Sequence, residues 1–194
     1  RTMPTKILVI DDEPAIVHDE WRQSGALDAL ANVYDDIFVY GLEGIYNPLI
    51  GLPNQQLFAD KIRYTGYLKR AVPSPMPPYR HPRITKGPFI LVTPGGGGDG
   101  AGVIDWVISA YESDQTIELP ALIVFGPFMS REKRKEFTDR IARLPKLESI
   151  GFEPRLELLM NRAHCVVAMG GYNTFCEILS FDKPALIVPR VKPR

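Results

Sequence analysis

The chain has 194 residues, of which 45% are hydrophobic and 24% charged, as is usual for a globular protein. Its 23 basic and 23 acidic residues balance, so the bulk charge does not favour binding to nucleic acid or to an anionic membrane. No apolar run reaches the roughly 20 residues of a membrane span and the first residues lack a signal-peptide core, so we expect a cytoplasmic protein without a nucleic-acid partner, and peripheral membrane contact stays open.

The chain opens with short strands and one long helix. Residues 6–10 are a run of apolar β-formers, and the acidic turn that ends in Pro14 predicts a helix start. Apolar residues at helical spacing continue to about residue 33, and we expect Gly25 to interrupt this helix. Two further strands are predicted over residues 36–40 and 62–66.

The opening segment KILVIDDEP also resembles the start of a response-regulator receiver domain. A receiver domain requires a second buried strand that ends in Asp further along the chain, and then a Lys. Residues 51–60, GLPNQQLFAD, lack the pattern of a strand, so the receiver interpretation is disfavoured.

Five prolines fall within residues 73–82, where they prevent sheet pairing and favour a stiff, extended backbone. We therefore predict a domain boundary in this stretch. The expected division is a partial α/β domain over residues 1–70, a linker over 71–85 and a second domain over 86–194. Because no helix follows the last predicted strand, we expect the second domain to be incomplete at its C-terminal end.

Residues 86–194 alternate between apolar strands and helices. This alternation predicts a parallel sheet with helices on both faces, as in Rossmann-like domains. The predicted strands cover residues 88–93, 121–125, 147–152, 165–168 and 185–188, and the predicted helices cover residues 100–112, 131–143, 155–162 and 171–181.

Ligands of such sheets bind beyond the carboxyl ends of the strands, and the first candidate is the glycine-rich loop after residue 93. Its bare backbone amides precede a helix and suit a phosphate group. Gly95, Gly97 and Gly100 fit the dinucleotide pattern G-x-G-x-x-G, but the next strand lacks the acidic residue that would bind the ribose, and no Gly-Lys-Ser/Thr sequence of a P-loop is present. A glycine turn without a ligand is the alternative.

The second candidate is the turn in which Gly170 and Gly171 join a strand to a helix. Backbone amides at this helix start, together with the helix dipole, would favour a diphosphate. Polar residues three and four positions apart form what we call the polar stripe, made of Asn173, Thr174 and Glu177.

The carboxylate at the far end of the polar stripe could accept hydrogen bonds from both hydroxyls of a ribose. The opposite side of the helix is expected to face the core through Phe175, Ile178 and Leu179. The alternatives are that Glu177 is a solvated helix residue and that Asn173 caps the helix.

The third candidate is Arg190, which follows the last strand and could neutralise a phosphate. A solvated surface arginine is equally compatible with the sequence. There is no Asp-x-Asp motif, and the three histidines are scattered, so neither a metal nor a cofactor is expected.

Residues 165–190, CVVAMGGYNTFCEILSFDKPALIVPR, resemble the donor-site segment of GT-B glycosyltransferases, in the family that contains the bacterial lipid II-forming N-acetylglucosaminyltransferase. They are most similar to a branch of uncharacterised predicted glycosyltransferases, in which the Gly-Gly-Tyr-Asn-Thr…Glu and Val-Pro-Arg elements recur. The glycine loop 95–98 and the segments 126–129 and 63–67 resemble the same branch, so the resemblance covers most of residues 15–194.

The resemblance implies a GT-B-like α/β fold, in which residues 1–70 are the remnant of the acceptor domain and residues 86–194 bind the donor. It implies metal-independent transfer of a sugar from a nucleoside diphosphate, with UDP favoured and an N-acetylhexosamine as one candidate sugar, to a hydroxyl acceptor. The start of the helix at Gly171 would meet the diphosphate, Glu177 the ribose, and the strand end at Phe152 the base. The implied donor-binding residues are Gly95, Gly96, Gly97, Phe152, Gly170, Gly171, Tyr172, Asn173, Thr174, Glu177 and Arg190.

Two features of the branch are missing from this sequence. The early glycine-rich turn of the acceptor domain has no counterpart in residues 1–70, and the Glu-Gln pair that usually follows the Val-Pro-Arg element is absent. We therefore expect an incomplete enzyme, in which no catalytic base can be assigned. A nucleotide-sugar epimerase on the same fold and a non-catalytic domain that binds a nucleotide sugar remain alternatives.

Overall fold

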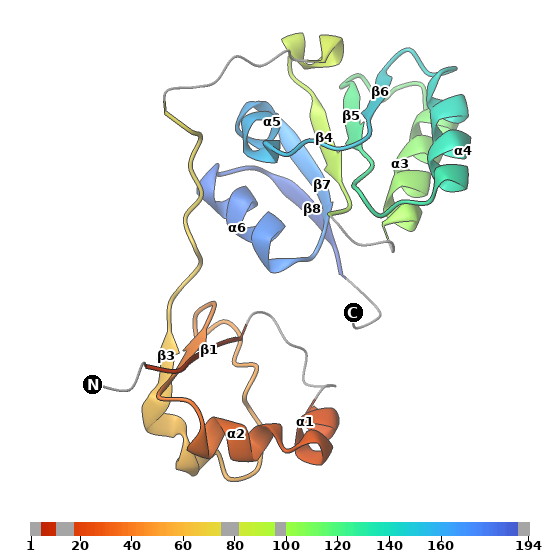
Figure 1. Ribbon diagram of the computed structural model, residues 1–194. Helices are drawn as coiled ribbons and strands as arrows, with labels where there is room; N and C mark the ends of the chain where they lie inside the picture. The colour runs from red at the N-terminus through yellow and green to blue at the C-terminus, as the bar shows by residue number, and fades with distance from the viewer. Residues whose placement is uncertain (1–4, 11–17, 75–81, 96–99, 190–194) are drawn as a thin grey trace. The chain divides into compact units, whose positions relative to one another are not determined.

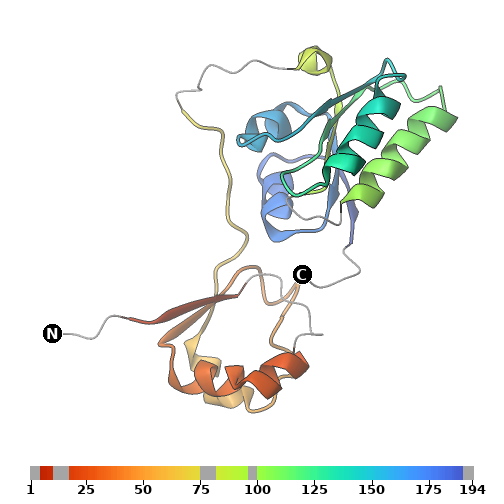
Figure 2. The ribbon, with the colours of Figure 1, turned by 45° about the vertical axis from the view of Figure 1, so that its right-hand side comes forward.

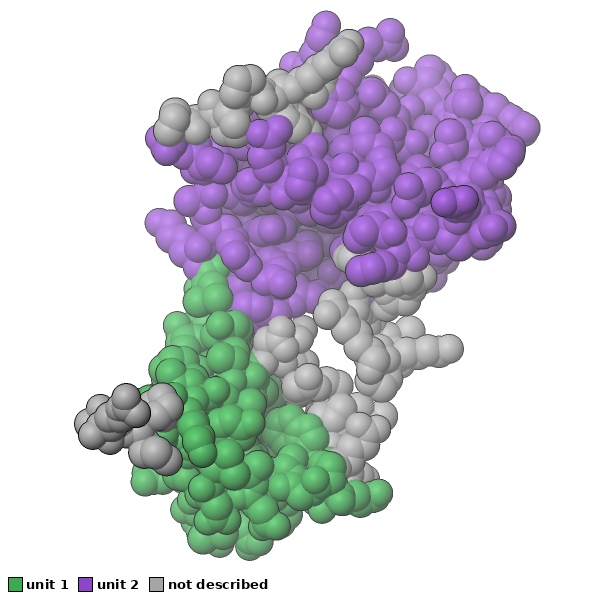
Figure 3. Space-filling model, viewed as in Figure 1, with its two compact units in different colours: residues 1–68, 193 green, residues 69–192, 194 purple. Residues whose placement is uncertain are grey.

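The structure is a computed structural model that describes residues 5–10, 18–74, 82–95 and 100–189. The chain divides into two compact units, residues 1–68 with 193 and residues 69–192 with 194, which Figure 3 draws in two colours. Of the expected linker, residues 71–85, the structure describes 71–74 and 82–85. Its last three residues belong to the 3-10 helix η4 (Arg83–Lys86) of the second unit.

The first unit is built on a parallel sheet of three strands, in the order β1-β2-β3 (Figure 1). Its elements are β1 (Ile7–Ile10), α1 (His18–Ser24), α2 (Ala26–Asn32), β2 (Asp36–Val39), η2 (Gln55–Leu57), η3 (Ala59–Lys61) and β3 (Ile62–Tyr64). Gly25 separates α1 from α2 with φ at +76°, a conformation that favours glycine, so the predicted interruption is confirmed. The apolar core consists of Ile10, Leu30, Ile37, Val39, Leu49, Leu52 and Phe58.

The strand order of this unit excludes the receiver interpretation. In the flavodoxin-like order of receiver domains, the first strand lies between the second and the third. Here β2 pairs with both of the others, since Ile37 lies opposite Leu8 on one side and opposite Ile62 on the other.

The second unit is a five-stranded parallel sheet in the order β6-β5-β4-β7-β8. The strands are β4 (Ile90–Thr93), β5 (Ala121–Val124), β6 (Leu147–Ile150), β7 (Cys165–Met169) and β8 (Ala185–Val188), and the helices are α3 (Ala101–Ser113), α4 (Arg131–Ile141), α5 (Leu156–Arg162) and α6 (Tyr172–Ser180). All nine predicted elements are present, with ends that differ from the prediction by at most two residues.

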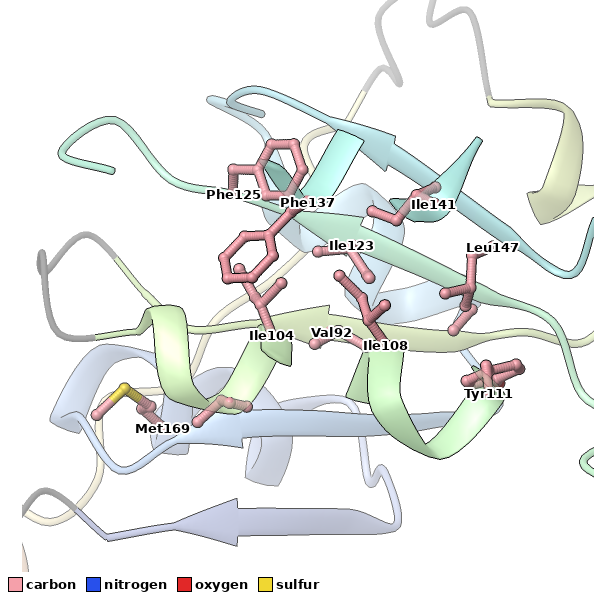
Figure 4. Close-up of a cluster of buried hydrophobic side chains, with 12 residues drawn as sticks. Val92, Ile104, Ile108, Tyr111, Ile123, Phe125, Phe137, Ile141, Leu147 and Met169 are labelled. Carbon is pink, nitrogen blue, oxygen red and sulfur yellow. The ribbon is translucent and has the colours of Figure 1, made fainter. Parts of the chain in front are cut away.

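Helices cover both faces of this sheet, because its strands are apolar on both sides. Figures 1 and 2 show α3 and α4 side by side on one face and α5 and α6 on the other. On the first face, the rings of Phe125 and Phe137 stack with their centroids 6.4 Å apart, and Figure 4 shows them together with Ile104 and Val92. On the second face, the core includes Leu91, Leu122, Val166 and Ile178.

The chain therefore moves from β4 outward to β6, and then returns past β4 to form β7 and β8. β4 and β7 are therefore the neighbouring strands between which the order of strands along the sheet reverses. A crevice outside the carboxyl ends of two such strands is where open α/β sheets bind their ligands, so the fold itself points to one place on the second unit.

Candidate functional site

The two predicted glycine turns leave the sheet from neighbouring strands at this switch point. β4 and β7 pair in register up to their carboxyl ends, where Thr93 lies opposite Ala168. The first turn begins at Pro94 and the second at Gly170, directly beyond this pair. Two segments that lie far apart in the sequence are thus brought together.

In the turn after β4, the packing itself requires glycine. Gly95 has φ at +77°, in the left-handed region. A Cβ atom at Gly100 would lie 2.1 Å from the Cβ of Pro94, which no real structure tolerates without movement. The predicted residues Gly96 and Gly97 lie outside the described residues.

The turn after β7 differs, because its packing does not require glycine. Gly171, the N-cap of α6, has extended φ and ψ of −147° and 142°, and a Cβ there would meet no described residue within 4 Å. A Cβ at Gly170 would make an ordinary contact of 3.6 Å with Ile187. The side chain of Tyr172, the first residue of α6, is buried.

The polar stripe of α6 is contacted by Arg70, which the sequence analysis did not select. The Arg70 backbone N–H donates to Ser180 Oγ at 2.8 Å, and its Nη2 donates to Asn173 Oδ1 at 2.7 Å. Its Nε is buried and has no hydrogen-bond partner among the described residues. Arg70 lies between the segment 63–67 and the proline-rich stretch 73–82, where no periodicity or motif marks a single arginine.

Asn173 is not a helix cap, contrary to one alternative raised from the sequence. α6 begins at Tyr172 and its N-cap is Gly171, which forms no side-chain capping bond. Asn173 therefore lies inside the first turn, where its side-chain oxygen accepts from Arg70 instead of from an amide of α6.

Glu177 is half-buried, and its surroundings shift its ionisation. Burial raises the pKa of the Glu177 carboxyl above its ordinary value, the charge of Arg70 lowers it, and Glu157 on α5 raises it again. The desolvation effect is the largest of the three. A desolvated carboxylate beside a guanidinium is unlike a solvated helix residue, and perturbed groups of this kind cluster at functional sites.

The core-facing side of α6 was predicted incorrectly in part. Ile178 is buried as expected, but Leu179 is 50% exposed and Phe175 is only half-buried. Cys176 and Tyr172, one turn apart, occupy the buried side instead. The stripe of Asn173 and Glu177 still lies away from the core.

Two aromatic side chains project from the loops that follow β5 and β6. Phe152, which the resemblance places near the base, is 60% exposed, and Phe128 is 74% exposed. A hydrogen bond of 3.0 Å from Gly126 N to Gly151 O joins the two loops. Arg190 lies outside the described residues.

Other features of the described residues lie away from this site. A cavity of about 700 Å³ lies near the amino ends of β5 and β6, where α4, β6 and η4 line it, and it contains none of the predicted site residues. No group of three or more His, Cys, Asp and Glu side chains within the described ranges is arranged to hold a metal ion. Nor does any described helix have the length and apolarity needed to cross a bilayer.

Comparisons with known proteins agree with the fold. A solved structure described as the glycotransferase of kitacinnamycin aligns with a TM-score of 0.53 at 13% identity, which is a likeness of fold. The alignment covers 92% of this chain and 43% of that one, so this chain spans less than half of the length of the solved protein. No curated protein matches.

The family is identified by the second unit. Residues 89–193, more than half of the chain, match the C-terminal domain of glycosyltransferase family 28. This match and the structural likeness confirm the predicted GT-B-like α/β fold class. The chain therefore belongs to glycosyltransferase family 28, whose C-terminal domain it carries.

Proposed function

We propose that the second unit binds a nucleoside diphosphate sugar at the switch point, for transfer of the sugar to a hydroxyl acceptor. Family membership supports a role in glycosyl transfer. The observation that carries the donor site is the glycine at position 171, which neither its backbone angles nor its neighbours require. A bare backbone at the start of α6 leaves room for a ligand that approaches the helix end.

The diphosphate lies against the turn after β7 in this proposal. The turn leads directly into α6, and the dipole of a helix adds a partial positive charge at its start, which favours an anion there. Backbone donors and cations can stabilise the departing diphosphate in place of a metal ion. The sugar, the uridine base near Phe152 and the lipid II-forming branch rest on the resemblance of residues 165–190.

The ribose lies along the polar stripe, with its hydroxyls donating to Glu177. The stripe continues from the phosphate position up one side of α6, and its carboxylate lies one turn beyond Asn173. Arg70 has a supporting role, because it holds Asn173 by a hydrogen bond and its charge lowers the pKa of Glu177, which partly offsets the effect of burial.

The test compares UDP with 2′,3′-dideoxy-UDP by calorimetry, in the unmodified chain and in Glu177→Gln. A hydrogen bond to a charged group contributes about 1.5–3 kcal/mol, so Glu177→Gln should weaken UDP binding by roughly tenfold or more. The loss should be much smaller for the dideoxy analogue, which has no hydroxyls to donate.

Glu157→Gln is the matched control, since it removes a nearby carboxylate that raises the pKa of Glu177 but does not lie on α6. It should leave the affinity for UDP within about twofold, well under the 1.4 kcal/mol of a tenfold change. Equal weakening of both nucleotides by Glu177→Gln would reject the ribose contact.

A further inference from the structure

Three loops at the carboxyl edge of the second unit are connected through one glycine. Gly126, in the loop after β5, has φ at +84°, and a Cβ atom there would lie 2.6 Å from the carbonyl oxygen of Gly95. Its N–H donates to Gly151 O at 3.0 Å. The position of Gly126 therefore sets the start of the glycine turn after β4 and the loop after β6 that carries Phe152.

The side chain of Arg134 is hydrogen-bonded to Gly126. Arg134 belongs to the first turns of α4, whose N-cap is Ser130, and its Nη2 donates to Gly126 O at 3.1 Å. Its Nη1 lies close to the loop after β6, 3.4 Å from where a Cβ at Gly151 would be. Arg134 is thus hydrogen-bonded to the loop after β5 and lies beside the loop after β6.

The surroundings of this guanidinium are unusual for a residue with a purely structural role. Its Nε is buried without a hydrogen-bond partner in the part of the chain that the structure describes, and no ion pair with a carboxylate is found there. Arg140 on the same helix differs, because it donates to Glu112 and Ser109 and is paired with Asp105.

We propose that Arg134 is a positioning residue of the donor site, an inference that rests on the proposed function. Its guanidinium fixes Gly126, and through Gly126 it presets Gly95, at the start of the turn after β4, and the loop after β6 for the nucleotide. Its unpaired positive charge near the carboxyl ends of the strands also favours an anionic ligand. Without Arg134, the loops after β5 and β6 lose this preset arrangement and must be ordered when the ligand binds. The conformational entropy lost in that ordering reduces the affinity.

The test uses the whole chain and follows UDP affinity by calorimetry. Arg134→Ala should weaken UDP binding about tenfold or more, and guanidinium chloride at concentrations well below denaturing ones should restore part of the affinity by filling the vacated site. Urea should not restore it, because urea carries no charge. A purely structural role would not give this rescue, which is the distinguishing readout.

Arg131→Ala removes an arginine from the same helix and is the control, expected to bind UDP as tightly as the unmodified chain. If Arg134→Ala does not fold, Arg134→Lys serves instead. Lysine keeps the charge and reaches Gly126 O but cannot fill the planar space beside Gly151, so an intermediate loss of affinity is expected with unchanged thermal stability.

The outcomes separate this inference from the proposed function. If the unmodified chain does not bind UDP, the proposed function fails. If the unmodified chain binds UDP, and Arg134→Ala or Arg134→Lys binds it equally well, the positioning role is overturned. Weakened binding in Arg134→Ala without rescue by guanidinium would also overturn it.

Discussion

The two glycine turns at the switch point contain the same residue type for different reasons. After β4, glycine is needed by the protein itself, since Gly95 has a left-handed backbone and Gly100 lies directly against Pro94. After β7, Gly171 is extended, and a Cβ there would meet none of the described residues within 4 Å. Packing explains the glycines of the first turn, whereas packing against the described residues does not explain Gly171, and we propose a ligand as the reason for it.

This difference shows how a glycine can be assigned to structure or to ligand binding. A glycine that the fold requires gives no evidence for a ligand, even within a suggestive motif such as G-x-G-x-x-G. A glycine that the fold does not require, at a helix start beside a switch point, does give such evidence. The turn after β4 has the more conspicuous sequence, but the turn after β7 has the stronger claim.

The largest effect is expected on stability, in the turn after β4. Gly100→Ala would place a Cβ within 2.1 Å of Pro94 and force the turn to move. Overpacking of this kind costs about 1–3 kcal/mol, and we expect a value toward the upper end because two atoms of Pro94 are in the way. Urea denaturation measures the change in the free energy of unfolding.

Gly102→Ala is the matched control for this change. Gly102 lies in α3, two residues after the N-cap Gly100, and a Cβ there would meet none of the described residues within 4 Å. Since alanine favours a helix over glycine by up to about 1 kcal/mol, this variant should be slightly more stable than the unmodified chain. If both variants lose the same stability, the packing explanation of the first turn is wrong.

The next effect is expected on ligand binding, in the turn after β7. Gly171→Val introduces a residue that readily adopts extended angles into a place without steric conflict, so stability should change by less than about 1 kcal/mol. The side chain would cover the first amides of α6 and should weaken UDP binding at least tenfold, or about 1.4 kcal/mol.

Calorimetry with UDP and a thermal melt of the same sample measure both quantities for Gly171→Val. Unchanged affinity would remove the ligand explanation for this glycine. A large loss of stability would instead place Gly171 with the glycines that the fold requires.

The smallest expected effect is a pH dependence of ligand affinity at the turn after β7, through Glu177. Because burial raises the pKa of Glu177 above its ordinary value of 4.5, the carboxylate protonates at a higher pH than a solvated glutamate. Affinity for a UDP-sugar, whose diphosphate stays ionised across this range, should therefore fall a few-fold as the pH drops toward 4.5, and Glu177→Gln should bind with no such dependence.

Lowering the pH should weaken ligand binding through Glu177, but it should stabilise the fold through the same residue. Since its pKa is higher in the folded than in the unfolded state, the stabilisation linked to its protonation is complete below 4.5 and is lost as the pH rises through the folded pKa. Denaturation of the unmodified chain and of Glu177→Gln across this range measures the difference. A pH dependence of UDP-sugar affinity that persists in Glu177→Gln would assign it to another group.

The elements of the second unit could be predicted from the sequence because each strand is a continuous apolar run and each helix follows a clear turn. In the first unit, the predicted break at Gly25 and the three strands were also found. The buried side of α6 was harder to predict, because Phe175 and Leu179 are as apolar as the residues that are buried, and packing against the sheet decides which of them turn inward.

The site could be predicted only as far as local pattern reaches. The turns beyond β4 and β7 are visible as strand–glycine–helix segments, and the parallel sheet implies that they share an edge. The contacts of Arg70 and Arg134 are not visible, because they depend on which residues far away in the sequence meet an arginine. Nor could the sequence separate required glycines from unrequired ones, since that depends on neighbours such as Pro94.

The pairing of β4 with β7 has a consequence for the order of folding. β4 meets β5 after one short crossover, but Thr93 and Ala168 are separated by roughly 75 residues, and pairing over such distances slows folding because the chain entropy of the intervening segment must be lost first. β4, β5 and β6 can assemble from neighbouring segments while the crevice still lacks one wall. We therefore expect the proposed ligand-binding edge to be completed by a late, long-range step, so that a ligand bound there would stabilise the chain only after β7 has paired with β4.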